Sequence, residues 1–162
     1  MDKDNFFVKT QIESNINAIE SLANTGVFSA PALRVFAEPS FVSIILKMHD
    51  LLQKLNALGH RVDFKDDVEN GDITDLISKV RNAICHLDSP ENLLDKDAQI
   101  KFVFCMAYGK ANLVQIGEKC AQSEYEDDIA FFYGEHRVYL KRHIFKLVHE
   151  TKNVYERLYR SQ

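Results

Sequence analysis

Hydrophobic residues recur every three or four positions in four stretches of the chain, with polar residues between them. This spacing puts the apolar side chains on one face of a helix, so each stretch predicts an amphipathic helix. A further short helical turn is expected at 31–38, because proline suits the first position of a helix. The expected helices run from about Val8 to Gly26, from an N-cap at Ser40 to Gly59, from an N-cap at Asp72 or Thr74 along an apolar stripe to Leu87, and from about Leu140 to Arg160.

The hydrophobic pattern changes after the third helix. Residues 101–108 and 128–140 are rich in aromatic and β-branched side chains, and Gly134-Glu135 suits a hairpin turn. We therefore expect an antiparallel sheet of two to four strands in a β-rich insert at residues 100–140, between the motif helix described below and the last helix. The predicted fold class is mainly α, a helical bundle of about four to five helices with this small β insert, in one domain covering residues 1–162.

Composition narrows the class of protein. A chain of 162 residues suits one domain with a real core, and 6 Gly and 3 Pro favour long helices. The three cysteines include no C-x-x-C pair, so neither a disulfide framework nor a zinc ribbon is indicated. The charged start does not resemble a signal peptide, and no apolar run is long enough for a membrane span. We expect a cytoplasmic protein with no membrane partner.

The third predicted helix carries a group of polar residues opposite its apolar stripe. On a helical wheel Arg81 and His86 lie about 140° apart at the edges of this polar face, whereas Asn82 and His86, four positions apart, can touch. Arginine binds a phosphate bidentately, an amide orients it, and histidine transfers a proton near neutral pH. Cys85 and His86 diverge by about 100°, which excludes a thiolate–imidazole pair between them. The alternative interpretation is an ordinary solvated helix face.

The sequence Arg81-Asn82-x-x-x-His86, on the predicted helix DLISKVRNAICHLDSP, resembles the R-x-x-x-x-H signature of the HEPN superfamily. Many members of that family are metal-independent endoribonucleases of toxin–antitoxin, abortive-infection and CRISPR-associated systems, and they typically dimerise so that two motifs share one site. The resemblance implies that Arg81 holds the scissile phosphate, Asn82 orients a reacting group, and His86 acts on the 2′-hydroxyl or the leaving oxygen. It also implies a 2′,3′-cyclic phosphate product, with no metal and no cofactor.

The resemblance further implies an RNA substrate, a homodimer, and an antitoxin or effector protein as a possible partner in antiviral defence. Asp88 stands where the subgroup paired with a nucleotidyltransferase antitoxin has a tyrosine, which argues against that particular partner. This departure and the aromatic insert support a second interpretation, a non-catalytic helical module that binds a nucleotide or a protein. A structural dimerisation domain is a third.

The last predicted helix is basic. Residues 137–162 hold seven Lys or Arg and two Glu, a net charge of +5, so the remaining 136 residues carry −9 within the total of −4. Lys141, Arg142 and Lys146 are the predicted RNA-binding residues, because such a row can follow phosphates while tyrosines stack on bases. The tyrosines concerned are Tyr139, Tyr155 and Tyr159. The alternative is a solvated face with half-buried tyrosines.

Other groups of metal-binding residue types have poor spacing. His136, His143 and His149 contain no pair four residues apart, so they do not predict a metal site. Two acidic stretches, residues 66–72 and 124–128, lack the alternating ligand register of a calcium loop and suit solvated turns.

Overall fold

The computed structural model describes residues 3–86 and 88–160, with the side chains described from Phe6 onward. Leu87, the predicted end of an apolar stripe, lies outside these residues. The helices are α1 (Lys3–Asn24), α2 (Ala37–Ala57), α3 (Ile73–Cys85) and α4 (Lys146–Tyr159), with two 3₁₀ segments, η1 (Pro31–Phe36) and η2 (Pro90–Asn92), and a π-helical segment, η3 (Leu140–Phe145). The strands are β1 (Leu93–Asp95), β2 (Ile100–Lys101), β3 (Cys105–Tyr108), β4 (Ala111–Ile116), β5 (Lys119–Ser123), β6 (Ile129–Tyr133) and β7 (His136–Tyr139).

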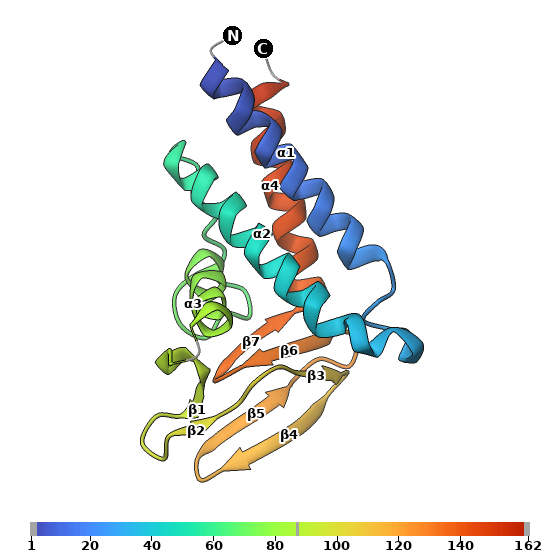
Figure 1. The fold of residues 1–162 in the computed structure, drawn as a ribbon, viewed down its shortest axis with the longest axis vertical. Helices are drawn as coiled ribbons and strands as arrows, with labels where there is room; N and C mark the ends of the chain where they lie inside the picture. Colours follow the sequence, from blue (N-terminus) through green and yellow to red (C-terminus); the bar gives the residue numbers. More distant parts are fainter. Residues whose placement is uncertain (1–2, 87, 161–162) are drawn as a thin grey trace.

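The helices gather at one end of the molecule and the strands at the other (Figure 1). Helix α2 packs against α1 and α3, and α4 packs against α1. The apolar faces predicted from the sequence meet in this layer, where Ile12, Ile45, Leu52, Ile77 and Leu147 are fully buried. Within the described residues no helix is long and apolar enough to cross a lipid bilayer.

The strands form three antiparallel sheets in the described chain: β3-β6-β7, β1-β2 and β4-β5. Alternate residues of β6 face opposite sides of the central sheet. Phe131 packs toward the helices, with its ring centroid 4.6 Å from that of Phe41. Phe132 faces the other way into a second apolar cluster that includes Leu94 and Ala121 of the small sheets. The strands therefore enclose a core of their own.

The predicted fold class, a mainly α bundle with two to four strands, is wrong. The described residues form seven strands in three sheets, so the fold is a mixture of helix and sheet. Strands β1, β4 and β5 were not predicted from the sequence. Strand β1 has only three residues, and the apolar residues of β4 and β5 face the second cluster, most of them only partly buried. Such strands give a weak periodic signal.

Two local predictions have opposite outcomes. The N-cap at Ser40 is wrong, because η1 runs directly into α2, which begins at Ala37. Pro39 fits inside this first turn, where backbone N–H groups have no intrahelical acceptor. The hairpin turn is confirmed, since Tyr133 pairs with His136 across Gly134-Glu135.

Gly134 satisfies two requirements at that turn. Its φ of +56° lies in the left-handed region that favours glycine. A Cβ atom at this position would also lie 2.0 Å from the backbone oxygen of Glu91, far inside van der Waals contact. The β6–β7 turn and segment η2 therefore touch through their backbones.

Candidate functional site

Helix α3 is fixed at its start by Asp72, one of the two alternative caps predicted from the sequence. The Asp72 carboxylate accepts a hydrogen bond from Asp75 N (3.0 Å), and the Asp75 carboxylate accepts one from Asp72 N (3.3 Å), which is a capping box. Arg61 donates to both carboxylates. The predicted apolar stripe is buried, with Ile73, Leu76, Ile77, Val80 and Ala83 all at or below 7% exposure.

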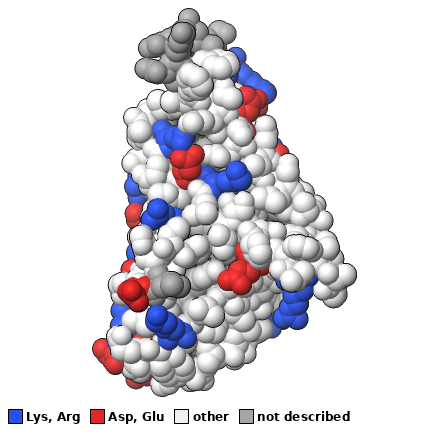
Figure 2. Space-filling view, viewed as in Figure 1, with Lys and Arg blue, Asp and Glu red and all other residues white. Residues whose placement is uncertain are grey.

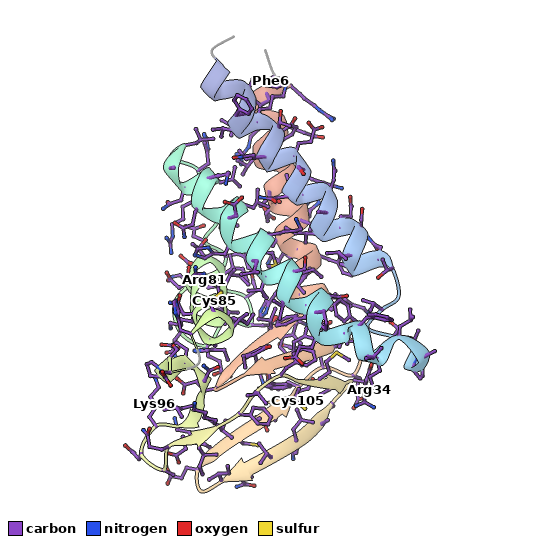
Figure 3. All side chains as sticks on the ribbon, viewed as in Figure 1. Phe6, Arg34, Arg81, Cys85, Lys96 and Cys105 are labelled. Atoms are coloured by element: carbon purple, nitrogen blue, oxygen red, sulfur yellow. The ribbon has the colours of Figure 1, made fainter. Side chains whose placement is uncertain are left out.

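This burial orients the motif residues on the other side of α3. Asn82 and Cys85 are exposed and Arg81 is half-buried, and Figure 3 shows Arg81 and Cys85 on α3. No carboxylate of the described residues forms an ion pair with Arg81. Its Nη1 atom instead donates to Asn82 Oδ1 (3.2 Å) and lies 3.3 Å from His86 Nε2.

The contact between Arg81 and His86 corrects the predicted geometry. The separation of about 140° assumes that the helix continues through His86. Helix α3 ends at Cys85 instead, and His86 is extended, with φ −129° and ψ 101°. Its backbone N–H still donates to Asn82 O (3.1 Å), while its ring turns toward Arg81. One chain therefore brings the two side chains together without a second copy.

The segment that follows the motif holds His86 in this position. The His86 carbonyl oxygen accepts hydrogen bonds from Ser89 N and from Asn92 Nδ2, both at 2.9 Å. Asn92 is buried and belongs to η2. The backbone of His86 is thereby anchored, and its exposed ring remains accessible from solvent.

A second histidine, which the sequence analysis missed, lies in the electrostatic field of Arg81. His49 of α2 is half-buried. Burial lowers the pKa of its imidazole, the positive charge of Arg81 lowers it further, and Asp50 opposes the shift. Because His49 becomes a neighbour of Arg81 only when α2 packs on α3, no spacing along the chain could have identified it.

The predicted RNA-binding residues Lys141 and Arg142 are already paired with acidic residues. Arg142 Nη1 donates to Asp128 Oδ2 (2.9 Å), and its Nη2 donates to Asp127 Oδ1 (3.0 Å). Its guanidinium also lies over the ring of Tyr125, 3.6 Å from the centroid. The Lys141 ammonium is 3.6 Å from Asp127 Oδ2. These cations are compensated within the chain.

Lys146 and three further cations of the basic segment are paired in the same way. Lys146 forms an ion pair with Asp66, and its ammonium lies 4.6 Å from the ring centroid of Phe64. Further ion pairs join Arg137 to Glu69 (3.1 Å), Lys152 to Glu20 (2.6 Å) and Arg160 to Glu156 (3.4 Å). Figure 2 accordingly shows cationic and acidic side chains interspersed on the visible face. The local charge of +5 does not form a free cationic track.

The tyrosines of the basic segment are also less available than an RNA-stacking role needs. Tyr139 is fully buried and its hydroxyl accepts a hydrogen bond from Glu124 N (3.1 Å), while Tyr155 is 6% exposed. Tyr159 is half-buried against Tyr155, with 5.2 Å between ring centroids. This arrangement matches the alternative given for the last helix, a solvated face whose tyrosines are half-buried.

The three histidines considered for a metal have different surroundings. His143 is fully buried, where its Nδ1 accepts a hydrogen bond from Tyr139 N (3.0 Å) and its Nε2 lies 3.3 Å from Asp66 O. Burial lowers the pKa of His143 to about 4, so this ring is neutral. His149 is exposed, and His136 pairs with Glu91.

No protein-family model, curated protein or solved structure matches the chain. The resemblance to the HEPN superfamily therefore depends on the motif residues alone. What these residues can do chemically is inferred from their geometry at the end of α3.

Proposed function

We propose that this protein is a metal-independent endoribonuclease in which Arg81 and His86 act on a phosphodiester of RNA. The observation that supports it most directly is the 3.3 Å contact between Arg81 Nη1 and His86 Nε2 on an exposed surface. Phosphodiester cleavage through the 2′-hydroxyl needs a cation that can bind the phosphate and an accessible base. Arg81, which has no carboxylate partner among the described residues, and the exposed imidazole of His86 can supply the two groups. The HEPN-like motif supports the same chemistry and a role as a cytoplasmic toxin or antiviral defence effector.

In the proposed reaction, an incoming phosphate takes the place of the imidazole as the partner of Arg81. The guanidinium binds the non-bridging oxygens and stabilises the charge that develops on them. This exchange frees His86 Nε2 to accept the proton of the 2′-hydroxyl. The 2′-oxygen then bonds to phosphorus, the bond from phosphorus to the 5′-oxygen breaks, and a 2′,3′-cyclic phosphate forms. Asn82 orients Arg81 through the contact that the two already make.

The leaving 5′-oxygen needs a proton from a second group. We propose that His86 of a second copy donates it, in a homodimer whose two motifs face one another across a two-fold axis. A chain carrying His86→Ala, when mixed in excess with wild type, would then form heterodimers that keep a single His86 and lack either the general base or the general acid. A fall in cleavage steeper than the dilution of wild type supports the shared site, and a monomer in analytical ultracentrifugation contradicts it.

The deciding experiment compares purified wild type with His86→Ala on total RNA, in the presence and absence of EDTA. We expect a loss of about 10²- to 10⁴-fold in cleavage rate, the usual contribution of a general base, with no effect of EDTA on the wild type. His149→Ala is the matched control, because His149 is also an exposed histidine. Cleavage that needs a divalent ion, or that survives His86→Ala, contradicts the proposal.

A specific observation favours a second candidate, a non-catalytic module that binds a nucleotide or a protein partner. The paired cations of residues 137–146 leave little free positive charge to hold a long RNA. This candidate predicts that the pure protein cleaves no RNA but binds a mononucleotide through Arg81. Loss of that binding in Arg81→Ala would support it, measured by isothermal titration calorimetry.

A further inference from the structure

We propose that Glu91, Glu135 and His136 form a binding site for one divalent transition-metal ion of the Zn²⁺ class. Each side chain offers one ligand atom, and the three atoms lie within 4.8 Å of one another. Glu91 belongs to η2, Glu135 to the β6–β7 turn and His136 to β7, so the ion would join two segments that are distant in sequence. The inference does not depend on the proposed ribonuclease activity.

The backbone brings these ligands together before any metal binds. Gly134 packs so closely on Glu91 that a Cβ atom there would be 2.0 Å from the Glu91 oxygen, and Gly134 N donates to Phe102 O (2.6 Å). The next two residues along the chain are the ligands Glu135 and His136. Because the turn is held by backbone contacts, the three side chains need only small rotations to bind one ion.

Burial of the three side chains suits a bound ion that keeps access to water. Exposure is 9% for His136, 22% for Glu91 and 35% for Glu135. Glu135 and His136 also line a cavity of about 60 Å³, large enough for water to serve as a fourth ligand. His136 is therefore the most enclosed of the three ligands, and Glu135 is the most accessible to water.

The ligand chemistry favours a transition metal over Mg²⁺ or Ca²⁺. One imidazole nitrogen with two carboxylates is a mixed N/O set, which suits Zn²⁺ and its neighbours, whereas Mg²⁺ and Ca²⁺ prefer oxygen alone. Two donors on a tetrahedral ion at about 2.0–2.1 Å lie roughly 3.4 Å apart. Binding would thus separate the hydrogen-bonded Glu91 and His136 slightly and draw Glu135 inward.

Two lysines compete with the ion for Glu135. The ammonium of Lys96, labelled in Figure 3, lies 3.3 Å from one Glu135 oxygen, and that of Lys119 lies 3.8 Å from the other. Both lysines are more than half exposed, so each can turn away into water when a metal binds. Removing one ammonium takes away one of the two competitors for Glu135, so we expect Lys96→Gln to bind Zn²⁺ more tightly than the wild type.

A metal at this site would stabilise the segment that anchors His86. Asn92, next to Glu91, donates to the His86 carbonyl oxygen and accepts from Phe102 N (3.0 Å). We therefore expect the ion to raise the thermal stability of the whole chain. At free Zn²⁺ about 100 times the Kd, the expected rise in Tm is about 5–10 °C.

The test is isothermal titration calorimetry and thermal unfolding of the full chain with Zn²⁺, with Mg²⁺ as a second probe. We expect one Zn²⁺ per chain in the wild type and at least tenfold weaker binding in Glu91→Gln, in Glu135→Gln and in His136→Ala. Glu135→Gln guards against a folding defect, because this side chain is partly exposed in a turn. Glu69→Gln, a carboxylate of the same cavity outside the ligand set, is the matched control and keeps binding.

Exposed Cys85 and Cys120 could bind Zn²⁺ elsewhere, so Co²⁺ spectroscopy identifies the ligands. We expect the d–d bands of a site with nitrogen and oxygen ligands and no thiolate charge-transfer band. Unchanged affinity in Glu91→Gln and Glu135→Gln, a thiolate band, or no saturable Zn²⁺ binding would overturn the proposal. None of these readouts uses RNA, so the metal site and the ribonuclease proposal are tested separately.

Discussion

The end of helix α3 and segment η3, which leads into helix α4, both carry cationic side chains, but their partners differ. Arg81 contacts an amide and an imidazole from its own sequence neighbourhood. Arg142 contacts carboxylates, including that of Asp128, whose side chain is fully buried. A phosphate can replace the partners of Arg81 without leaving a buried charge alone, whereas at Arg142 it would have to displace Asp128. Charge counted along a sequence is therefore a poor measure of the charge available to a ligand.

The largest expected effect is on activity at the end of α3. Arg81→Lys keeps one positive charge but removes the planar fork that binds two phosphate oxygens. If the proposed function is right, cleavage falls by about 10²- to 10³-fold while Tm stays unchanged, since the side chain is half-buried and has no buried ionic partner. Arg142→Lys is the control and should keep its cleavage rate. Equal losses in both variants would remove the distinction between the two regions.

The next effect is on stability at segment η3. The Asp128 carboxylate accepts hydrogen bonds from Ile129 N, Lys141 N (both 2.8 Å) and the Arg142 guanidinium. Asp128→Ala leaves these donors unpaired, so we expect a loss of about 3 kcal/mol in the free energy of unfolding, measured with urea. The exposed neighbour Asp127 provides the control, and Asp127→Ala should barely move the urea midpoint. A similar small shift for both would show that the buried pairing contributes little.

A smaller effect is expected from pH. His143 titrates at about 4 in the folded protein but near its ordinary 6.5 when unfolded, so the unfolded chain takes up the proton first. Its contribution to stability is full above pH 6.5 and is lost as pH falls toward 4. Between pH 7 and pH 5 the loss is about 2 kcal/mol. Urea unfolding at both pH values should show this difference in wild type and a reduced one in His143→Gln, whose amide oxygen can still accept from Tyr139 N.

The smallest effect concerns RNA affinity. Because Lys141 and Lys146 are paired with Asp127 and Asp66, we expect Lys141→Gln and Lys146→Gln to change the Kd for single-stranded RNA by less than about twofold. A residue that really binds a phosphate would instead reduce the slope of log K against log salt by about 0.7. Fluorescence anisotropy over a salt series separates these outcomes. A reduced slope would restore the RNA-binding role predicted from the sequence.

The structural features that could be predicted from the sequence are those set by residues close together along the chain. The four amphipathic helices, the Asp72 cap and the turn at Gly134-Glu135 follow from residues within a few positions of one another, and the structure confirms them. The motif residues Arg81 and Asn82 were correctly placed outside the buried face of α3. Their proposed roles in catalysis remain a prediction, whereas the structure shows where the two side chains lie on α3.

The features that were missed depend on contacts between distant parts of the chain. Strands β4 and β5 are stabilised by a cluster that also includes Leu94 and Phe132, so their own pattern is weak. Lys146 meets Asp66 eighty positions away, which no charge count along a helix can show. The His86 carbonyl oxygen is held by Asn92 outside the helix, whereas the helical wheel that placed His86 about 140° from Arg81 assumed a continuous helix.

The close packing of Gly134 against Glu91 has a consequence for genetic screens. Saturation mutagenesis scored by loss of function should return Gly134 among its strongest positions, since every replacement adds a Cβ that collides with a backbone atom. Substitutions there would mimic those at Arg81 and His86 in a growth assay, but they would also lower the yield of folded protein. A parallel measurement of protein abundance would distinguish Gly134 from Arg81 and His86, because only substitutions at Gly134 should lower the yield of folded protein.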